Sequence, residues 1–199
     1  MNTFLIDYDL SKNFTYLDEK RLFKQLLESY QILNTLVNNK KSWSNHPAVK
    51  QWHGHEKHLF SYIYSCQHEC IKRNIAPESK IFGNALSLFS KIMDSINQPP
   101  PIWWGREDII NSHKSRLLCK GEIDSLCAAI KSKLKIKNLN NWIKERFDGK
   151  EKNQLKYKDI NILNNYVVLA DAQEFVKPNH YAQFGWTTPY NLEYIWPVK

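Results

Sequence analysis

Apolar residues recur every three to four positions along most of this chain, a spacing that predicts amphipathic helices. The clearest example is residues 17–37, where one side is apolar and the other is polar. Its apolar stripe holds Leu22, Leu26, Leu33 and Val37, and its polar side holds Arg21, Lys24, Gln25, Glu28 and Gln31. Glu28 is therefore expected on a polar face, within reach of residues one turn away, where Lys24 can form an ion pair with it.

A second helix is predicted to begin at Pro47, because proline suits the first turn of a helix. Either Asn45 or His46 can cap that start. Its apolar positions continue to about Arg73, so the pattern predicts one helix over this range, with Cys66 and Cys70 turned inward.

A third apolar segment spans residues 81–96, and residues 107–118 predict a further helix. Three consecutive prolines at 99–101 impose an extended break between them. The expected fold class is all-α, a single compact helical domain over residues 1–199. We expect its N-terminal segment to cross between the two long helices.

The chain changes character after residue 119. The segment from 131 to 158 carries ten Lys or Arg residues, against four acidic residues up to position 159. We interpret residues 119–183 as an insertion or accessory segment, followed by an aromatic C-terminal tail. The basic run either adds DNA contacts or forms a solvated pair of surface helices, the more common fate of charge runs.

Net charge favours a polyanionic partner. Lys and Arg number 28 against 20 acidic residues, which gives a net charge of +8 and an isoelectric point near 9.2. Each Lys or Arg that meets a phosphate releases counterions, so nucleic acid is the expected partner.

The cellular compartment is expected to be intracellular, in cytoplasm, nucleoid or a virus. Four cysteines form no Cys-x-x-Cys pair, which favours reduced thiols. No apolar run is long enough to span a bilayer. Asp7 and Asp9 occupy positions where a signal peptide would be apolar, so neither a signal peptide nor a membrane partner is expected.

Several blocks of sequence together form a recognisable order. They are Met-Asn-Thr-Phe-Leu at residues 1–5, the frame of Leu17, Arg21-Leu22-Phe23 and Glu28, Asn-His-Pro-Ala-Val at 45–49, Gly54-His55, and the Ser/His/Arg run at 112–118. This order resembles the pyrimidine dimer DNA glycosylase family, whose members are endonuclease V-like, and is closer to its bacterial branch. The resemblance covers residues 1–75 and 102–118, and does not cover 119–183.

The resemblance implies a DNA glycosylase with AP-lyase activity on damaged or modified pyrimidines, with pyrimidine dimers as the family's substrate. It implies an N-terminal amine as nucleophile, from Met1 or Asn2, and Glu28 as the acid/base residue. An α-amine titrates near ~8, so part of it is neutral and able to attack the sugar. We also expect double-stranded DNA as the partner, a monomeric protein, and a reaction that uses neither a cofactor nor a metal.

The residues expected to contact DNA lie on the polar side of the first helix, in the histidine-containing blocks and in the tail. They are Arg21, Lys24, Gln25, Gln31, His46, His55, His113, Arg116, Trp186 and Tyr190. Leu27 and Gln31 stand where the phage enzyme has phosphate-binding arginines, which leaves the lesion specificity open.

Two alternatives remain at this stage. A non-catalytic basic helical module would bind nucleic acid by charge alone and would tolerate loss of Glu28. A metal-dependent hydrolase could use His55 and His58, which are three residues apart on one helix. Base access could also require an aromatic wedge, for which Trp103, Trp104, Trp186 and Tyr190 are candidates, although each is more often a core residue.

Overall fold

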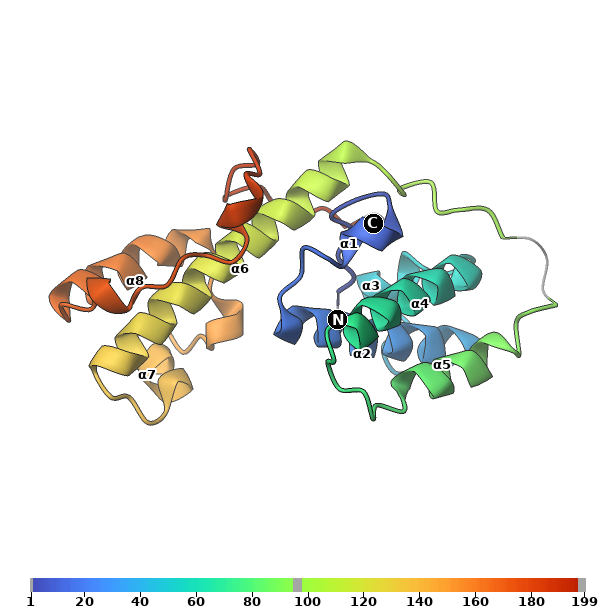
Figure 1. Cartoon of the computed structure of the whole chain (residues 1–199), viewed down its shortest axis with the longest axis horizontal. Helices are drawn as coiled ribbons and strands as arrows, with labels where there is room; N and C mark the ends of the chain where they lie inside the picture. Colours follow the sequence, from blue (N-terminus) through green and yellow to red (C-terminus); the bar gives the residue numbers. More distant parts are fainter. Residues whose placement is uncertain (1, 95–97, 197–199) are drawn as a thin grey trace. The chain divides into compact units, whose positions relative to one another are not determined.

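A computed structural model describes residues 2–94 and 98–196, and the regular structure of these residues is helical throughout (Figure 1). The predicted all-α class is confirmed. The chain divides into two compact units, the first formed by Met1–His113 and Tyr194–Lys199 and the second by Lys114–Glu193. The extent of one domain over residues 1–199 stays a prediction. In the described part of the chain, no helix is both long and apolar enough to cross a membrane.

The first unit is built on three helices that pack against one another. Its helices are α1 (Leu10–Asn13), α2 (Glu19–Val37), α3 (Pro47–Lys50), α4 (Glu56–Lys72) and α5 (Ile81–Phe89). Helices α2, α4 and α5 contact one another and lie side by side in Figure 1. Their buried faces include Leu22, Leu26, Ile32, Leu33, Leu59, Ile63, Cys66 and Cys70. The predicted inward positions of both cysteines are confirmed.

The predicted helix from residue 47 to Arg73 is interrupted, and this part of the prediction is wrong. His46 caps α3, where its Nδ1 accepts a hydrogen bond from the Ala48 backbone over 3.0 Å. The chain then turns through residues 51–55, and α4 begins only at Glu56. Gly54 lies in this turn with φ +79°, a left-handed conformation that glycine adopts readily and that ends a helix. The spacing of hydrophobic residues cannot reveal a helix break that depends on the backbone conformation of one residue.

The predicted third segment, residues 81–96, forms α5 only as far as Phe89. Residues 95–97 lie outside the described residues. The helix predicted at 107–118 is longer than expected, since α6 (Glu107–Lys133) continues for fifteen residues beyond Leu118 and contributes to both units.

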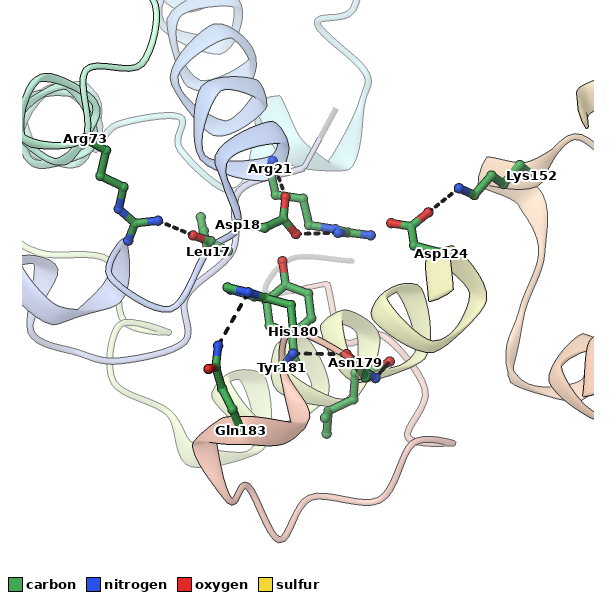
Figure 2. A network of polar contacts seen from close by, with 11 residues as sticks. Leu17, Asp18, Arg21, Arg73, Asp124, Lys152, Asn179, His180, Tyr181 and Gln183 are labelled. Atoms are coloured by element: carbon green, nitrogen blue, oxygen red, sulfur yellow. Dashed lines mark hydrogen bonds and ion pairs between the residues drawn. The ribbon is translucent and has the colours of Figure 1, made fainter. Parts of the chain in front are cut away.

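Arg73, at the end of α4, holds the chain just before α2. Its guanidinium donates to the carbonyl of Leu17 over 2.6 Å, as Figure 2 shows, and to the carbonyls of Phe14 and Thr15 over 3.2 and 2.8 Å. Asp18 then caps α2 by accepting from the Arg21 backbone over 2.9 Å. These contacts fix where α2 begins, and therefore where Glu28 lies along it.

The second unit has a hydrophobic core of its own. After α6 come α7 (Leu139–Arg146), η1 (Lys152–Gln154), α8 (Tyr157–Leu169), η2 (Gln173–Phe175) and η3 (Ala182–Phe184). Their buried residues include Ile123, Cys127, Ile130, Ile143, Phe147, Leu155, Leu163 and Val167. Ile143, Phe147 and Leu155 come from the basic segment 131–158, so one side of that segment is packed and it is not a wholly solvated pair of helices.

Part of the positive charge of the basic segment is paired within the second unit. The pairs are Lys144 with Glu151 at 2.9 Å, Lys150 with Asp159 at 2.9 Å, and Lys152 with Asp124 at 2.6 Å, the last drawn in Figure 2. Asp159 is buried, so its pairing with Lys150 compensates a carboxylate removed from water. These lysines therefore stabilise the fold locally.

Candidate active site

Residues 2–6 form an extended segment through the core of the first unit, with no partner strand among the described residues. Buried backbone N–H groups need partners, and here the partners are side chains. Asn2 N donates to Glu28 Oε2 over 2.9 Å, Phe4 N to Gln25 Oε1 over 2.7 Å, Leu5 N to His113 Nδ1 over 2.8 Å, and Ile6 N to Asn13 Oδ1 over 2.6 Å. Side chains from α1, α2 and α6 thus hold the segment in one position.

Gln25 is the central residue of this arrangement. Besides accepting from Phe4 N, it donates through Nε2 to the carbonyl of Asn2 over 2.9 Å. The Tyr62 hydroxyl, from α4, lies 2.7 Å from Gln25 Oε1 and 2.9 Å from the carbonyl of Phe4. Gln25 is only 2% exposed. It was predicted to contact DNA from a polar face, but its burial commits it to holding the N-terminal segment.

Thr3 is held from the other side by the turn between α3 and α4. Its hydroxyl accepts hydrogen bonds from Gln51 Nε2 over 2.5 Å and from Trp52 Nε1 over 3.0 Å. Trp52 in turn packs at a steep angle against Trp103, and Trp103 is the one of the four candidate wedge residues that is buried in the core. The turn between α3 and α4 therefore fixes the position of Thr3 through two hydrogen bonds to its hydroxyl.

Glu28 lies on α2 with its carboxylate directed at the start of the chain. One oxygen accepts from Asn2 N at 2.9 Å, and the other lies 3.8 Å from Lys24 Nζ. The predicted pairing with Lys24 at i−4 is confirmed. Lys24 is well exposed, whereas the Glu28 side chain is largely enclosed, so the contact with Asn2 is the more specific of the two.

His113 and Tyr194 complete the surroundings of Asn2. His113 is 1% exposed, and this burial lowers its pKa to about 3, although its backbone hydrogen bond with Leu5 acts in the opposite direction. The ring is neutral at neutral pH, and Nδ1 accepts from Leu5. Tyr194 stacks on the His113 ring with centroids 4.8 Å apart and donates its hydroxyl hydrogen to Asn2 Oδ1. His113 was expected to bind DNA, but its side chain is buried and holds the N-terminal segment in place by accepting a hydrogen bond from Leu5 N.

A polar cavity of about 380 Å³ opens beside Glu28. It is lined by Glu28, Gln31, Asn34, Thr35, Lys40, Ser42 and Trp43. A second cavity, of about 600 Å³, shares Thr35 and Lys40 with the first and adds two further lysines, Lys41 and Lys50. Glu28 thus lines a polar pocket, and the cavity that adjoins it is lined by three lysines and one carboxylate, that of Glu56.

His46 lies at the edge of this region. Its ring is 5.6 Å from that of Trp43 and 5.8 Å from that of Trp196, measured between centroids. Partial burial lowers the pKa of His46, while the charge of Glu28 acts in the opposite direction. His46 was expected to contact DNA, and its place beside the Glu28 pocket keeps it available for that role.

The remaining predicted site residues are distributed over both units. Arg21 pairs with Asp18, as Figure 2 shows, and His55 Nδ1 lies 2.9 Å from the carbonyl of Pro99. Gln31 lines the Glu28 pocket. Three others, Arg116, Trp186 and Tyr190, belong to the second unit. Met1, one of the two candidate nucleophiles, lies outside the described residues.

The metal-dependent alternative receives no support from the described residues, in which no cluster of three or more His, Cys, Asp and Glu side chains could hold a metal ion. The sequence pattern predicted an inward position for Tyr62 and an aromatic tail that includes Tyr194, but it gave no role at the site to Tyr62, Asn13, Tyr194 or Trp43. Of these four residues, only Trp43 could have been recognised as a candidate from the sequence, because it is a large aromatic residue within a loop of Asn, Lys and Ser.

The site combines a carboxylate held against the start of the chain, a polar pocket beside that carboxylate and an adjoining group of lysines. This combination fits a helical protein that acts on nucleic acid. Comparison with protein families points in the same direction for the N-terminal part of the chain. Residues 1–82 match the family described as pyrimidine dimer DNA glycosylase, in agreement with the resemblance. The match includes Asn2, Glu28 and His46 and ends before His113. Neither the curated proteins nor the solved structures compared with the chain gave a match.

Proposed function

We propose that this protein is a DNA glycosylase with AP-lyase activity on damaged or modified pyrimidines, with pyrimidine dimers as the substrate that the family suggests. Its nucleophile is the N-terminal amine, and Glu28 is its acid/base residue. Double-stranded DNA is the partner, and the protein works inside the cell or virus as a monomer without a cofactor.

The observation that carries the proposal is the 2.9 Å hydrogen bond between the backbone nitrogen of Asn2 and Glu28 Oε2. Removal of Met1 would turn this nitrogen into an α-amine at the same carboxylate. The contact therefore favours Asn2 over Met1 as the nucleophile. An α-amine has a pKa near ~8, so a useful fraction is neutral at neutral pH.

The chemistry follows from an amine and a carboxylate in contact. The neutral amine attacks C1′ of the damaged nucleotide, the bond from C1′ to the base breaks, and the base leaves with the bonding electrons. Glu28 stabilises the cationic sugar, takes a proton from the attacking nitrogen and returns it to O4′ as the C1′–O4′ bond breaks. The sugar ring opens, O4′ becomes a hydroxyl, and the nitrogen forms a protonated imine with C1′. Loss of a proton from C2′ to Glu28 then expels the 3′ phosphate by β-elimination and cleaves the strand.

Borohydride trapping tests the proposal directly, because it reduces the imine to a stable amine. The protein should become covalently linked to duplex DNA containing an abasic site, and mass mapping should place the adduct on residue 2, or on residue 1 if Met1 is retained. An adduct on an internal lysine would contradict the proposed nucleophile. Absence of any adduct, together with intact DNA binding, would favour the non-catalytic basic module.

A further inference from the structure

We infer that Trp43 is the stacking platform for the base of the nucleotide that reacts at Glu28. The inference rests on the proposed function and names a residue that determines which nucleotides the site accepts. Trp43 lies in the loop between α2 and α3, and its ring lines the same cavity as Glu28.

The exposure of Trp43 is the first observation. Its side chain is 59% exposed, whereas Trp52 and Trp103, elsewhere in the first unit, are buried. A tryptophan left largely in water contributes little to the core, since most of its apolar surface is not removed from solvent. Its ring is therefore available to a ligand that offers an aromatic face.

The backbone of Trp43 is the second observation. Its φ of +72° lies in the left-handed region, where a bulky residue is disfavoured. The turn is nevertheless fixed, because His46 N donates to the Trp43 carbonyl over 2.8 Å. Glycine or asparagine would adopt this conformation at lower cost, so tryptophan at this position carries a conformational cost while it lines the cavity.

The chemistry of the cavity fits a nucleobase. Its volume of about 380 Å³ is within the range of roughly 300–1,000 Å³ that small-molecule sites occupy. Gln31 and Asn34 contribute amide groups, which carry both donors and acceptors and so match the hydrogen-bonding edge of a base. An aromatic ring and amide groups that line one cavity can provide both stacking and edge contacts to a base.

The adjoining cavity supplies the complement to the phosphate backbone. Lys40 lines both cavities, and Lys41 and Lys50 line the second one. A nucleotide with its base against Trp43 can therefore direct its phosphates toward three lysines. Glu28 lines the base cavity, which brings the C1′ of a nucleotide bound there close to the carboxylate.

Two substrates separate this inference from the proposed function. The first is a duplex with a cyclobutane thymine dimer, which has a base to stack, and the second is a duplex with an abasic site, which has none. Trp43→Gly should slow base release from the first roughly 5- to 140-fold, the range that loss of one base–aromatic stack produces. Borohydride trapping on the abasic duplex should fall far less.

The matched variants are Trp43→Phe, which keeps an aromatic ring, and Tyr64→Ala, which removes an exposed aromatic residue on α4 away from the cavity. Trp43→Phe should recover most of the rate, and Tyr64→Ala should behave as wild type. Base release by Trp43→Gly at the wild-type rate would overturn the inference while trapping still supports the proposed function. Equal losses on both substrates would overturn it too, since Trp43 would then act without a base. Absence of trapping by the wild-type protein would overturn both.

Discussion

Gln25 and Tyr62 meet at 2.7 Å in the core of the first unit, and between them they hold both the N–H and the carbonyl of Phe4. Each comes from a different long helix, α2 and α4, so the N-terminal segment crosses between these helices as expected. The position of Asn2 relative to Glu28 depends on this pair, because Gln25 also binds the carbonyl of Asn2.

Removal of either side chain should therefore lower stability, by amounts that differ. Tyr62→Phe should cost about 1 kcal/mol, since Asn13 Nδ2 still donates to the Phe4 carbonyl over 3.2 Å. Gln25→Leu should cost on the order of 2–3 kcal/mol, because it leaves a buried N–H without its acceptor. Urea unfolding monitored by circular dichroism measures both. Equal costs for the two variants would contradict the central role assigned to Gln25.

Glu28→Gln should leave the fold and DNA binding nearly intact while strand cleavage falls by orders of magnitude. The amide oxygen can still accept from Asn2 N, but it can neither take a proton nor stabilise a cation. Single-turnover cleavage of abasic duplex DNA is the measurement. Lys24→Gln is the control, because it removes the ion pair at 3.8 Å and keeps the carboxylate. Its rate at saturating protein should stay close to wild type even if loss of a DNA contact weakens binding. Cleavage at the wild-type rate by Glu28→Gln would refute the assignment.

The buried His113 should make the protein less stable in acid. Its pKa is about 3 in the folded state and about 6.5 when exposed in the unfolded chain. Between these values the unfolded state binds the additional proton, so stability falls as pH decreases from 6.5 towards 3, by up to about 1.4 kcal/mol per pH unit.

Asparagine at position 113 tests this origin, since its oxygen can accept from Leu5 N and does not titrate. His113→Asn should flatten the dependence of unfolding free energy on pH between 6.5 and 3, measured by urea unfolding at several pH values. His68→Asn, which replaces an exposed histidine on α4, should keep the wild-type slope. The same slope in His113→Asn would locate the acid sensitivity elsewhere.

The exposed lysines of the basic segment should contribute affinity for DNA and no chemistry. Lys131, Lys135 and Lys137 are exposed, whereas Lys133 already lies 3.6 Å from Asp171. Each phosphate contact contributes about 0.9 to the slope of log affinity against log salt. Replacing the three exposed lysines by Gln should flatten this slope by up to about 2.7, and replacing them by Arg should preserve it. An unchanged salt slope in the Gln variant would mean that these lysines do not contact phosphate. A lower cleavage rate at saturating protein would mean that the segment helps to build the site around Glu28.

Local patterns in the sequence predicted a helix over residues 17–37, where α2 occupies Glu19–Val37, and the polar face that carries Glu28. They did not predict the inward position of Gln25, because a periodic pattern assigns glutamine to the solvent side whereas its partners, Asn2 and Phe4, lie more than twenty positions earlier. The same limit applies to His113, whose partner Leu5 is 108 positions away. The pocket at Trp43 depends on a loop conformation with positive φ, which hydrophobic spacing does not encode.

The hydrogen bonds that hold Phe4, Leu5 and Ile6 all end on main-chain atoms of these residues, and every amino acid except proline carries the same main-chain N–H and C=O groups. Related proteins could therefore exchange Phe4, Leu5 or Ile6 for other apolar residues of suitable volume without losing one of these bonds. The partners have no such freedom, since an acceptor of the correct length must stand at positions 13, 25 and 113. We therefore expect the polar residues at positions 13, 25 and 113 to vary less among related proteins than residues 4–6, whose position they determine.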